Sequence, residues 1–438
     1  MKLNYRRTFL IGLAFLTISS FWQLYDFVIP LILKDAFGIG DTVSGVVMSV
    51  DNILALFLLP LFGSLSDRTV CRMGRRMPYI VFGTIGAVVS MMLIPVAANQ
   101  RILWLFCVAL ALVLLSMATY RSPAVALMPD VTPKPLRSKG NAVINLMGAL
   151  GGTIVLAATK FIAPQDGSGD FFPLFGVTAG IMVAGVLILS LTTNEDQLVT
   201  KMRRDSIAAG IDEVDETEEA SAQEARKPEK LPKDVRKSLI LILCSISLWF
   251  MGYNAVTTAF SKYATTTLHM PAGDAAAVLL VAQVVAILAF LPVGMLSSKL
   301  GRRRSILIGI SVLTVVFLTA TFYTGFSPLM YVSFAFAGIA WAMINVNSLP
   351  MVVEMCRGAD VGKFTGYYYT FSMSAQIITP ILSGWLFELE RSLLGSDYRI
   401  LFPYGAFFVA LSFVTMFFVR HGDSEQNVRV NILEEMDN

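Results

Sequence analysis

Two acidic side chains stand inside long apolar stretches of this sequence. Asp26 lies in the stretch 8–33 and Asp51 in the stretch 43–65. An ionised side chain at the middle of a bilayer is disfavoured by about 2.5–3.5 kcal/mol, so an acid placed there is a functional hypothesis by default. We expect Asp26 and Asp51 to bind substrate and to carry any proton coupling. The alternative is that either acid caps a helix or stays hydrogen-bonded to a neighbour.

Polar and aromatic side chains accompany these acids. Ser19, Gln23 and Asp26 follow the i, i+4, i+7 spacing of one helix face, and Trp22 stands one turn before Asp26. Arg121 offers a rigid fork of hydrogen-bond donors. Amides and donors of this kind bind hydroxyl groups, and aromatic rings cover the apolar face of a sugar. The pattern therefore favours an uncharged, polyhydroxylated ligand.

The same residue types recur in later apolar stretches. The predicted substrate-binding residues are Trp22, Gln23, Asp26, Asp51, Arg121, Asn145, Tyr253, Asn254, Gln283, Trp341, Asn345 and Gln376. Taken singly, a residue of the later stretches more often forms a hydrogen bond between helices or anchors the membrane interface, and Arg121 alone also fits a helix end whose side chain reaches the interface. The set as a whole indicates a binding cavity.

Other chemistries have little support in the sequence. His269 and His421 are the only histidines, and the four cysteines form no CxxC or metal-ligand spacing. There is no nucleophile–base pair and no phosphate-binding loop. We therefore expect no enzymatic activity, no metal and no cofactor.

The rest of the chain is suited to hold these residues in a membrane. Of its 438 residues, 55% are hydrophobic and 15% are charged, with a mean hydropathy of +0.67. Soluble domains have about 25% charged residues, so a soluble enzyme and a nucleic-acid-binding protein are both excluded. A transmembrane helix needs about 20 mostly apolar residues. The segments that qualify are 8–33, 43–65, 78–97, 101–125, 140–163, 172–193, 238–262, 275–297, 304–324, 328–350, 363–388 and 401–420.

These segments predict an all-α membrane protein with twelve transmembrane helices. The first segment has no cleavage site and is interpreted as a retained helix rather than a signal peptide. Lysine and arginine gather in alternate loops and near the N-terminus, which predicts that both termini are cytoplasmic. The charged stretch 194–237 is interpreted as a cytoplasmic linker. It separates an N-terminal six-helix bundle, 1–193, from a C-terminal bundle with a short tail, 238–438.

A loop motif occurs twice. The sequence GSLSDR at 63–68 is followed by GRR at 74–76, and GMLSSK at 294–299 is followed by GRRR at 301–304. Both copies join the second and third helices of their half. Gly63 permits close approach of helix ends, and Asp67 can pair with an arginine or a helix N-terminus. We expect such contacts to hold the halves together at the cytoplasmic face; the alternative is that the arginines only set topology.

This repeated loop resembles the signature loop of the major facilitator superfamily, over the whole chain. The resemblance implies two pseudo-symmetric six-helix bundles with a site at their shared midplane and transport by alternating access. The predicted gating residues are Gly63, Asp67, Arg68, Gly74, Arg75 and Arg76. The second copy has Ser298 where the first has Asp67, so its latch is expected to be weaker.

Two stretches resemble a narrower group, the sucrose:proton symporters and the related glycoside–pentoside–hexuronide:cation symporters. They are PLFGSLSDR at 60–68 with GRRMPYI at 74–80, and RSPAVALMPD at 121–130. The stretch 55–59 lacks the acids of the sodium-linked members, which favours protons or no coupling. The fifth helix also lacks the Gly-Pro signature of drug:proton antiporters.

We therefore expect a secondary active transporter that carries a sugar or glycoside with a proton, as a monomer in the plasma membrane. Its partners would be the small-molecule substrate, the proton and the lipid bilayer, with no nucleic acid. Two alternatives stay open. One is an exporter of amphipathic compounds or a lysolipid carrier on the same fold, and the other is a membrane sensor that no longer transports.

Overall fold

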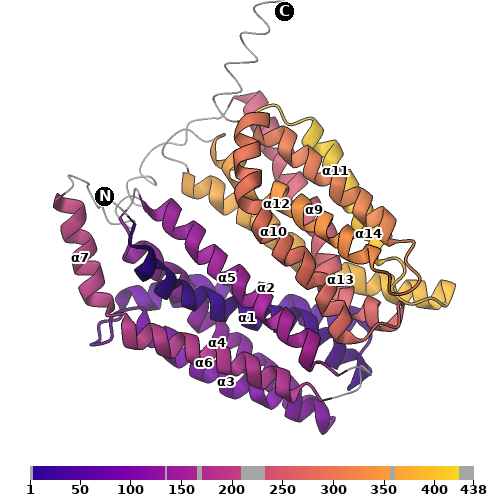
Figure 1. Cartoon of the computed structure of the whole chain (residues 1–438), viewed down its shortest axis with the longest axis horizontal. Coiled ribbons are helices and arrows are strands. Elements are labelled where there is room, and N and C mark those ends of the chain that lie inside the picture. The colour runs from indigo at the N-terminus through magenta and orange to yellow at the C-terminus, as the bar shows by residue number, and fades with distance from the viewer. Residues whose placement is uncertain (1–2, 134–135, 165–169, 209–231, 356–360, 424–438) are drawn as a thin grey trace, which may run out of the picture. The chain divides into compact units, whose positions relative to one another are not determined.

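The computed structural model describes residues 3–133, 136–164, 170–208, 232–355 and 361–423. Throughout these ranges the regular secondary structure is helical, without a strand (Figure 1). The helices of the first half are α1 (Tyr5–Asp35), α2 (Asp41–Arg68), α3 (Met77–Asn99), α4 (Leu103–Asp130), α5 (Arg137–Ile162), α6 (Phe172–Thr192) and α7 (Glu195–Ala208). Those of the second half are α9 (Lys233–Thr266), α10 (Ala272–Leu300), α11 (Arg302–Ala320), α12 (Leu329–Val353), α13 (Val361–Leu394) and α14 (Leu401–Phe417).

A helix overlaps each of the predicted membrane segments, so the predicted fold class is confirmed. Within the described ranges, ten helices are long and apolar enough to cross a membrane by length and composition. α13 and the 17-residue α14 fall outside these ten. In the stretch predicted as a linker, residues 195–208 form α7, and 209–231 lie outside the described residues.

The chain folds into two compact units. The first contains Met1–Ile39, Val50–Asp215 and Pro271–Ala277, and the second contains Gly40–Ser49, Glu216–Met270 and Val278–Asn438. The first residues of α2 thus belong with the second unit, and the start of α10 belongs with the first. The predicted division into 1–193, 194–237 and 238–438 stays a prediction.

Small residues let the helices of each unit approach closely. In the first unit α1 packs against α5 and α6, and α3 packs against α4. A Cβ atom at Gly148 would lie 2.9 Å from Ser19 Oγ, and one at Gly151 would overlap the backbone of Leu16. In the second unit α9 packs against α13 and α14, with the fully buried Trp249 in its core. Glycine at such contacts permits backbone approach that larger side chains prevent.

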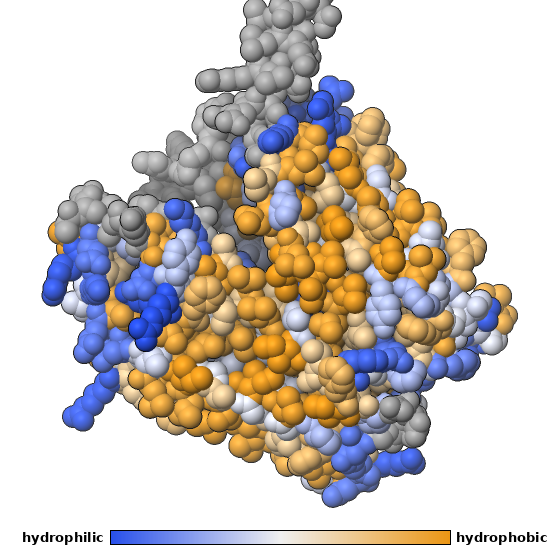
Figure 2. Space-filling view, viewed as in Figure 1, coloured by the Kyte–Doolittle hydropathy of each residue, from blue (hydrophilic) through white to orange (hydrophobic). Residues whose placement is uncertain are grey.

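The surface of the units matches a membrane environment. Figure 2 shows hydrophobic residues across the helices and hydrophilic residues gathered over α7 and near helix ends. Large apolar side chains such as Phe57, Phe82 and Leu291 are more than two thirds exposed. Exposed apolar area on this scale marks a lipid-facing surface rather than a water-facing one.

The two copies of the loop motif share a backbone conformation. Gly74 has φ +94° and Gly301 has φ +89°, a region that side chains with a Cβ rarely adopt. Each glycine stands just before the basic residues that lead into the next helix, Arg75 and Arg76 before α3 and Arg302 at the start of α11. The sequence repeat therefore corresponds to a repeated turn.

Candidate functional site

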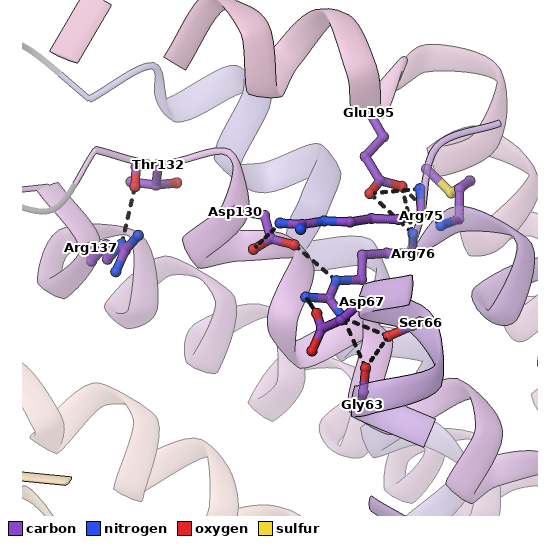
Figure 3. Close-up of polar contacts among 10 residues, drawn as sticks. Gly63, Ser66, Asp67, Arg75, Arg76, Asp130, Thr132, Arg137 and Glu195 are labelled. Carbon is purple, nitrogen blue, oxygen red and sulfur yellow. Dashed lines mark hydrogen bonds and ion pairs between the residues drawn. The ribbon is translucent and has the colours of Figure 1, made fainter. Parts of the chain in front are cut away.

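Arg76 is the centre of a polar cluster in the loop between α2 and α3 (Figure 3). Its side chain is 6% exposed. Nε donates to Asp130 Oδ2 at 2.9 Å, the guanidinium pairs with Asp67, and Nη1 donates to Ser66 Oγ and to the carbonyl oxygen of Gly63. The planar guanidinium has enough N–H donors for all four partners, whereas the ammonium group of lysine has only three.

Asp130, the last residue of α4, joins the two adjacent arginines. While Oδ2 accepts from Arg76, Oδ1 pairs with Arg75 Nη2 at 2.9 Å. Its side chain is 15% exposed, so water screens these pairs only partly. The ends of α2 and α4 are therefore tied to the start of α3 through charged side chains.

Glu195, the first residue of α7, caps the N-terminus of α3 and is 1% exposed. Its carboxylate accepts hydrogen bonds from the backbone N–H groups of Arg75, Arg76 and Met77 at 2.9–3.1 Å. Burial raises the pKa of Glu195, and the three N–H donors oppose that shift. Unpaired N–H groups and the positive end of the helix dipole favour a carboxylate at this place.

The structure thus brings together Gly63, Asp67, Arg75 and Arg76 of the predicted gating residues. Gly74 is required by its backbone conformation, and a Cβ there would also overlap Glu195. Cys71, in the same loop, directs its thiol at the carbonyl oxygen of Gly74 at 3.1 Å. Arg68 is exposed and forms no ion pair with any described residue. Asp130 is predicted only through the stretch that resembles the sugar symporters, and no sequence pattern points to Glu195.

The second copy of the loop has a different set of contacts. Arg302 pairs with Glu354 at the end of α12, and its backbone N–H donates to Asp423 at 2.6 Å. Asn347 donates to Ser297 Oγ at 2.8 Å. Charged contacts therefore exist at both copies, with different partners.

A second polar group lies within the helices of the first unit. Asp51 on α2 is within electrostatic range of Asp26 on α1 and of Arg121 on α4. The Arg121 guanidinium lies over the Trp22 ring, 5.7 Å from its centroid, in a cation–π contact. Four of the predicted substrate-binding residues are therefore neighbours, although they come from three helices.

Two buried donors beside these acids have no hydrogen-bond partner in the described structure. They are Trp22 Nε1 and the hydroxyl of Tyr25, both on α1. Tyr25 is 2% exposed and interacts electrostatically with Asp26 and Asp51. Leaving a buried donor unpaired is unfavourable by about 1–3 kcal/mol, so such a pair marks a place for a ligand or water. The predicted binding residues do not include Tyr25, although its position next to Asp26 is a signal for it.

Gln23 and Asn145 are less closely tied to this group. Gln23 is half-buried on α1, and Asn145 is exposed on α5. Neither side chain forms a hydrogen bond with another residue of the described ranges. Their assignment to substrate binding stays a prediction.

The second unit contains the remaining predicted binding residues. Tyr253 on α9 stacks on Trp341 of α12, with ring centroids 3.6 Å apart, and Phe250 meets the edge of Trp341. Next to Tyr253, the buried amide nitrogen of Asn254 has no hydrogen-bond partner in the described part of the chain. The rings offer an apolar face and the amide offers a hydrogen-bond donor, two features that small-molecule sites combine.

The other three predicted binding residues of the second unit are Gln376, Asn345 and Gln283. Gln376 donates to the carbonyl oxygen of Ser372 in its own helix at 3.4 Å. Asn345 is exposed on α12, and Gln283 is half-buried on α10. The role of all three in substrate binding stays a prediction.

Two groups of ion pairs at helix ends were not foreseen in the sequence. At the start of α2, Asp41 accepts from Lys262 Nζ at 2.7 Å, Tyr398 Oη at 2.8 Å and Arg391 Nη2 at 3.0 Å, all within the second unit. Burial, together with the charge of Asp41, raises the pKa of Tyr398, which therefore stays a donor. In the first unit Asp274, in the first turn of α10, pairs with Lys160 in the last turn of α5.

Comparison with known proteins identifies the class to which this fold and these loops belong. The sequence profile of the Major Facilitator Superfamily matches residues 11–311 and 242–434. The chain belongs to the Major Facilitator Superfamily and is a membrane transporter rather than an enzyme. The expected absence of enzymatic activity is thereby confirmed.

Individual relatives match this chain at low identity and over only part of its length. Multidrug resistance protein 2 of Bacillus subtilis (strain 168) is 24% identical over 279 residues, covering 62% of this chain and 64% of that protein. Proton-associated sugar transporter A of Mus musculus is 32% identical over 139 residues, covering 29% of this chain and 18% of that protein. The matched part thus spans less than two thirds of either relative.

Solved structures share the fold. The nucleoside transporter NupG, in a mutant form, aligns with a TM-score of 0.68 and 15% identity, over 94% of this chain and all of that one. A D-xylose-proton symporter aligns with a TM-score of 0.64 and 15% identity, over 95% and 98%. At this identity the likeness establishes the arrangement of helices alone.

Proposed function

We propose that this chain moves a sugar or glycoside across the plasma membrane together with a proton, by alternating access. The observation that carries the proposal is the group formed by Asp26, Asp51, Arg121 and Trp22 in the first unit. It combines hydrogen-bonding charges with an aromatic ring. Acids within transmembrane segments commonly mark substrate paths and proton relays.

The charges of this group suit a proton. Asp26 and Asp51 bring two carboxylates, and Arg121 brings one guanidinium. Binding of a single proton would leave the group neutral, a condition that favours movement of a site within a low-dielectric membrane. The coupling stoichiometry that we propose is therefore one proton per transport cycle.

The relatives give partial support. Proton-associated sugar transporter A and the D-xylose-proton symporter carry both elements of the proposal in their names. The narrower resemblance to sucrose:proton and glycoside symporters agrees with them. We further propose that the chain acts as a monomer with both termini in the cytoplasm, as the loop charges favour.

Export of amphipathic compounds is a second candidate function. The match to multidrug resistance protein 2 covers more of this chain than the match to the sugar transporter does. A cavity for amphipathic compounds needs chiefly apolar walls. The amides, acids and unpaired donors described above favour the sugar.

A sugar-evoked pH change tests the proposal. Cells expressing the chain in a lightly buffered medium should alkalinise that medium on addition of one mono- or disaccharide, whereas cells without it should not. Asp26→Asn should abolish the response, because one of the two acids is lost. Asp35→Asn is the matched control, since Asp35 ends the same helix and is exposed.

The outcomes separate the two candidates. A response retained in Asp26→Asn would exclude Asp26 as the coupling group. The absence of any response from chain shown to be in the membrane would favour export, and efflux of an amphipathic cation would then be measured.

A further inference from the structure

The two unpaired donors on α1 have one chemical requirement in common. Trp22 Nε1 and the Tyr25 hydroxyl are buried, and both need a hydrogen-bond acceptor. The rings meet edge to face with centroids 5.4 Å apart. A protein rarely leaves two neighbouring buried donors unpaired unless another molecule satisfies them.

The surroundings of Tyr25 restrict what that molecule is. The hydroxyl of Tyr25 interacts electrostatically with the carboxylates of Asp26 and Asp51, yet it donates to neither. The vicinity therefore offers a donor on Tyr25 and acceptors on the two acids. A group that accepts one hydrogen bond and donates another would satisfy both sides, and an alcohol does this with a single oxygen atom.

We infer that Tyr25 is a specificity-determining residue, whose hydroxyl donates to one hydroxyl oxygen of the substrate while the same substrate hydroxyl donates to Asp26 or Asp51. This inference rests on the proposed function and names the feature that the substrate must carry. The Trp22 N–H binds a second acceptor of the same ligand. Tetraphenylphosphonium, an amphipathic cation without an oxygen atom, leaves both donors unpaired.

Energetics make the discrimination measurable. A hydrogen bond that involves a charged group contributes about 1.5–3 kcal/mol, which corresponds to roughly a tenfold to hundredfold change in affinity. A site built around a substrate hydroxyl discriminates strongly against an analogue that lacks it, because its own polar groups are then left unpaired.

A cycle of protein and ligand changes tests the inference. The probes are D-glucose, D-xylose and sucrose, each with its set of monodeoxy analogues, and tetraphenylphosphonium as the amphipathic cation. Binding to the purified chain is measured for the unmodified protein and for Tyr25→Phe. Loss of one particular hydroxyl should weaken binding to the unmodified protein about tenfold or more. The loss should be clearly smaller in Tyr25→Phe, because only the hydrogen bond to Asp26 or Asp51 is then left to lose.

Tyr120→Phe is the matched control. Tyr120 is also fully buried in the first unit, but its hydroxyl already donates to the carbonyl oxygen of Ala14 at 2.8 Å. This variant should keep the full discrimination between sugar and deoxy analogue, even if its stability falls. Tetraphenylphosphonium binding should be equal in Tyr25→Phe and in the unmodified protein.

The experiment distinguishes a failure of the Tyr25 inference from a failure of the proposed function. Sugar binding with the same deoxy discrimination in Tyr25→Phe would overturn the inference and leave the proposed function standing, with water as the partner of Tyr25. Binding of tetraphenylphosphonium without binding of any of the three sugars would overturn both.

Discussion

At the scale of single residues, Arg76, just before α3, forms more polar contacts than its neighbours in the loop do. Its guanidinium is buried. It forms ion pairs with Asp67 and Asp130 and donates hydrogen bonds to Ser66 and to the backbone of Gly63. Its role depends on the geometry of the guanidinium, because charge alone cannot direct donors to partners on two helices.

Arg76→Lys tests this dependence. We expect the unfolding free energy to fall by about 1–3 kcal/mol, since buried acceptors lose their donors, and we expect transport to slow. Thermal unfolding of the purified protein in detergent measures the first effect. Arg68→Lys, at an exposed position, is the control, and equal melting temperatures for the two variants would contradict the prediction.

Glu195 gives a second prediction at this scale. Burial raises the pKa of Glu195, because it disfavours the charged carboxylate. Replacing Glu195 by a neutral amide therefore lowers stability less than the same change would at an exposed helix cap. Glu195→Gln keeps an oxygen that accepts from the N–H groups of α3, whereas Glu195→Ala leaves them unpaired. We expect Ala to lower stability by about 0.5–2 kcal/mol and Gln by clearly less.

The same melting experiment compares the two Glu195 variants side by side. If Gln and Ala destabilise equally, the hydrogen bonds to Arg76 and Met77 contribute little, and α7 is held by other contacts such as the donation of Arg7 to the carbonyl oxygen of Leu198.

At the scale of elements, corresponding helix ends carry corresponding ion pairs. Asp41 opens α2 and pairs with Arg391 in the last turn of α13, while Asp274 in the first turn of α10 pairs with Lys160 in the last turn of α5. The pairs occupy equivalent helices of the two sequence halves. They differ in burial, because the Asp41 side chain is 4% exposed and that of Asp274 is 33% exposed.

The difference in burial predicts unequal stability effects. Asp41→Asn leaves the Lys262 ammonium buried without its counter-charge, so we expect a loss of about 3–5 kcal/mol. Asp274→Asn disrupts a partly exposed pair and should lower stability by about 1 kcal/mol or less. Adding Lys262→Met to Asp41→Asn should recover part of the loss, as chemical denaturation in detergent can measure. Failure of the second change to recover any stability would contradict the account.

Sequence patterns predicted the elements far better than their connections. Length and hydropathy suffice to predict α1 or α12, because a membrane requires about 20 apolar residues of any helix that crosses it. The arginines of the loop after α2 were predicted from a repeated motif. Glu195 and Asp41 were not, since their partners lie 119 and 350 residues away along the chain. A charge near a helix end looks alike in sequence whether it is solvated or buried.

The same limit applies to the polar group of the first unit. Asp26 and Asp51 were predicted because acids stand out in apolar stretches, and the structure places them near each other. The unpaired hydroxyl of Tyr25 was not, since tyrosine is common in membrane helices and its hydrogen bonding depends on three-dimensional packing.

At the scale of the whole molecule, the two sequence halves repeat one plan with local differences. Gly74 and Gly301 make the same turn, yet the first is followed by a cluster around Arg76 and the second by the pair of Arg302 with Glu354. The stretch between the halves begins with α7. Glu195 and Leu198 of this helix contact residues of the first unit.

Deletion of 209–230, which lies outside the described residues, tests whether that stretch is only a connection. We expect transport to stay largely intact, because α7 is attached by Glu195 and by the contact of Arg7 with Leu198. Deletion of 195–208 should lower transport and stability. Loss of flux in the first variant, with the protein correctly inserted, would show a function for the deleted stretch.

The exposed thiol of Cys71 gives the loop after α2 a built-in labelling position. Cys71 lies three residues before Gly74 and five before Arg76, at a place open to aqueous reagents. Cys107, also exposed, belongs to the apolar surface of α4, which detergent or lipid would cover. Among the three cysteines of the described residues, a water-soluble maleimide carrying a spin label should therefore favour Cys71, and replacing Cys356, which lies outside those residues, by serine removes the fourth thiol. Its spectrum would report rearrangement of the arginine cluster during turnover without any engineered cysteine.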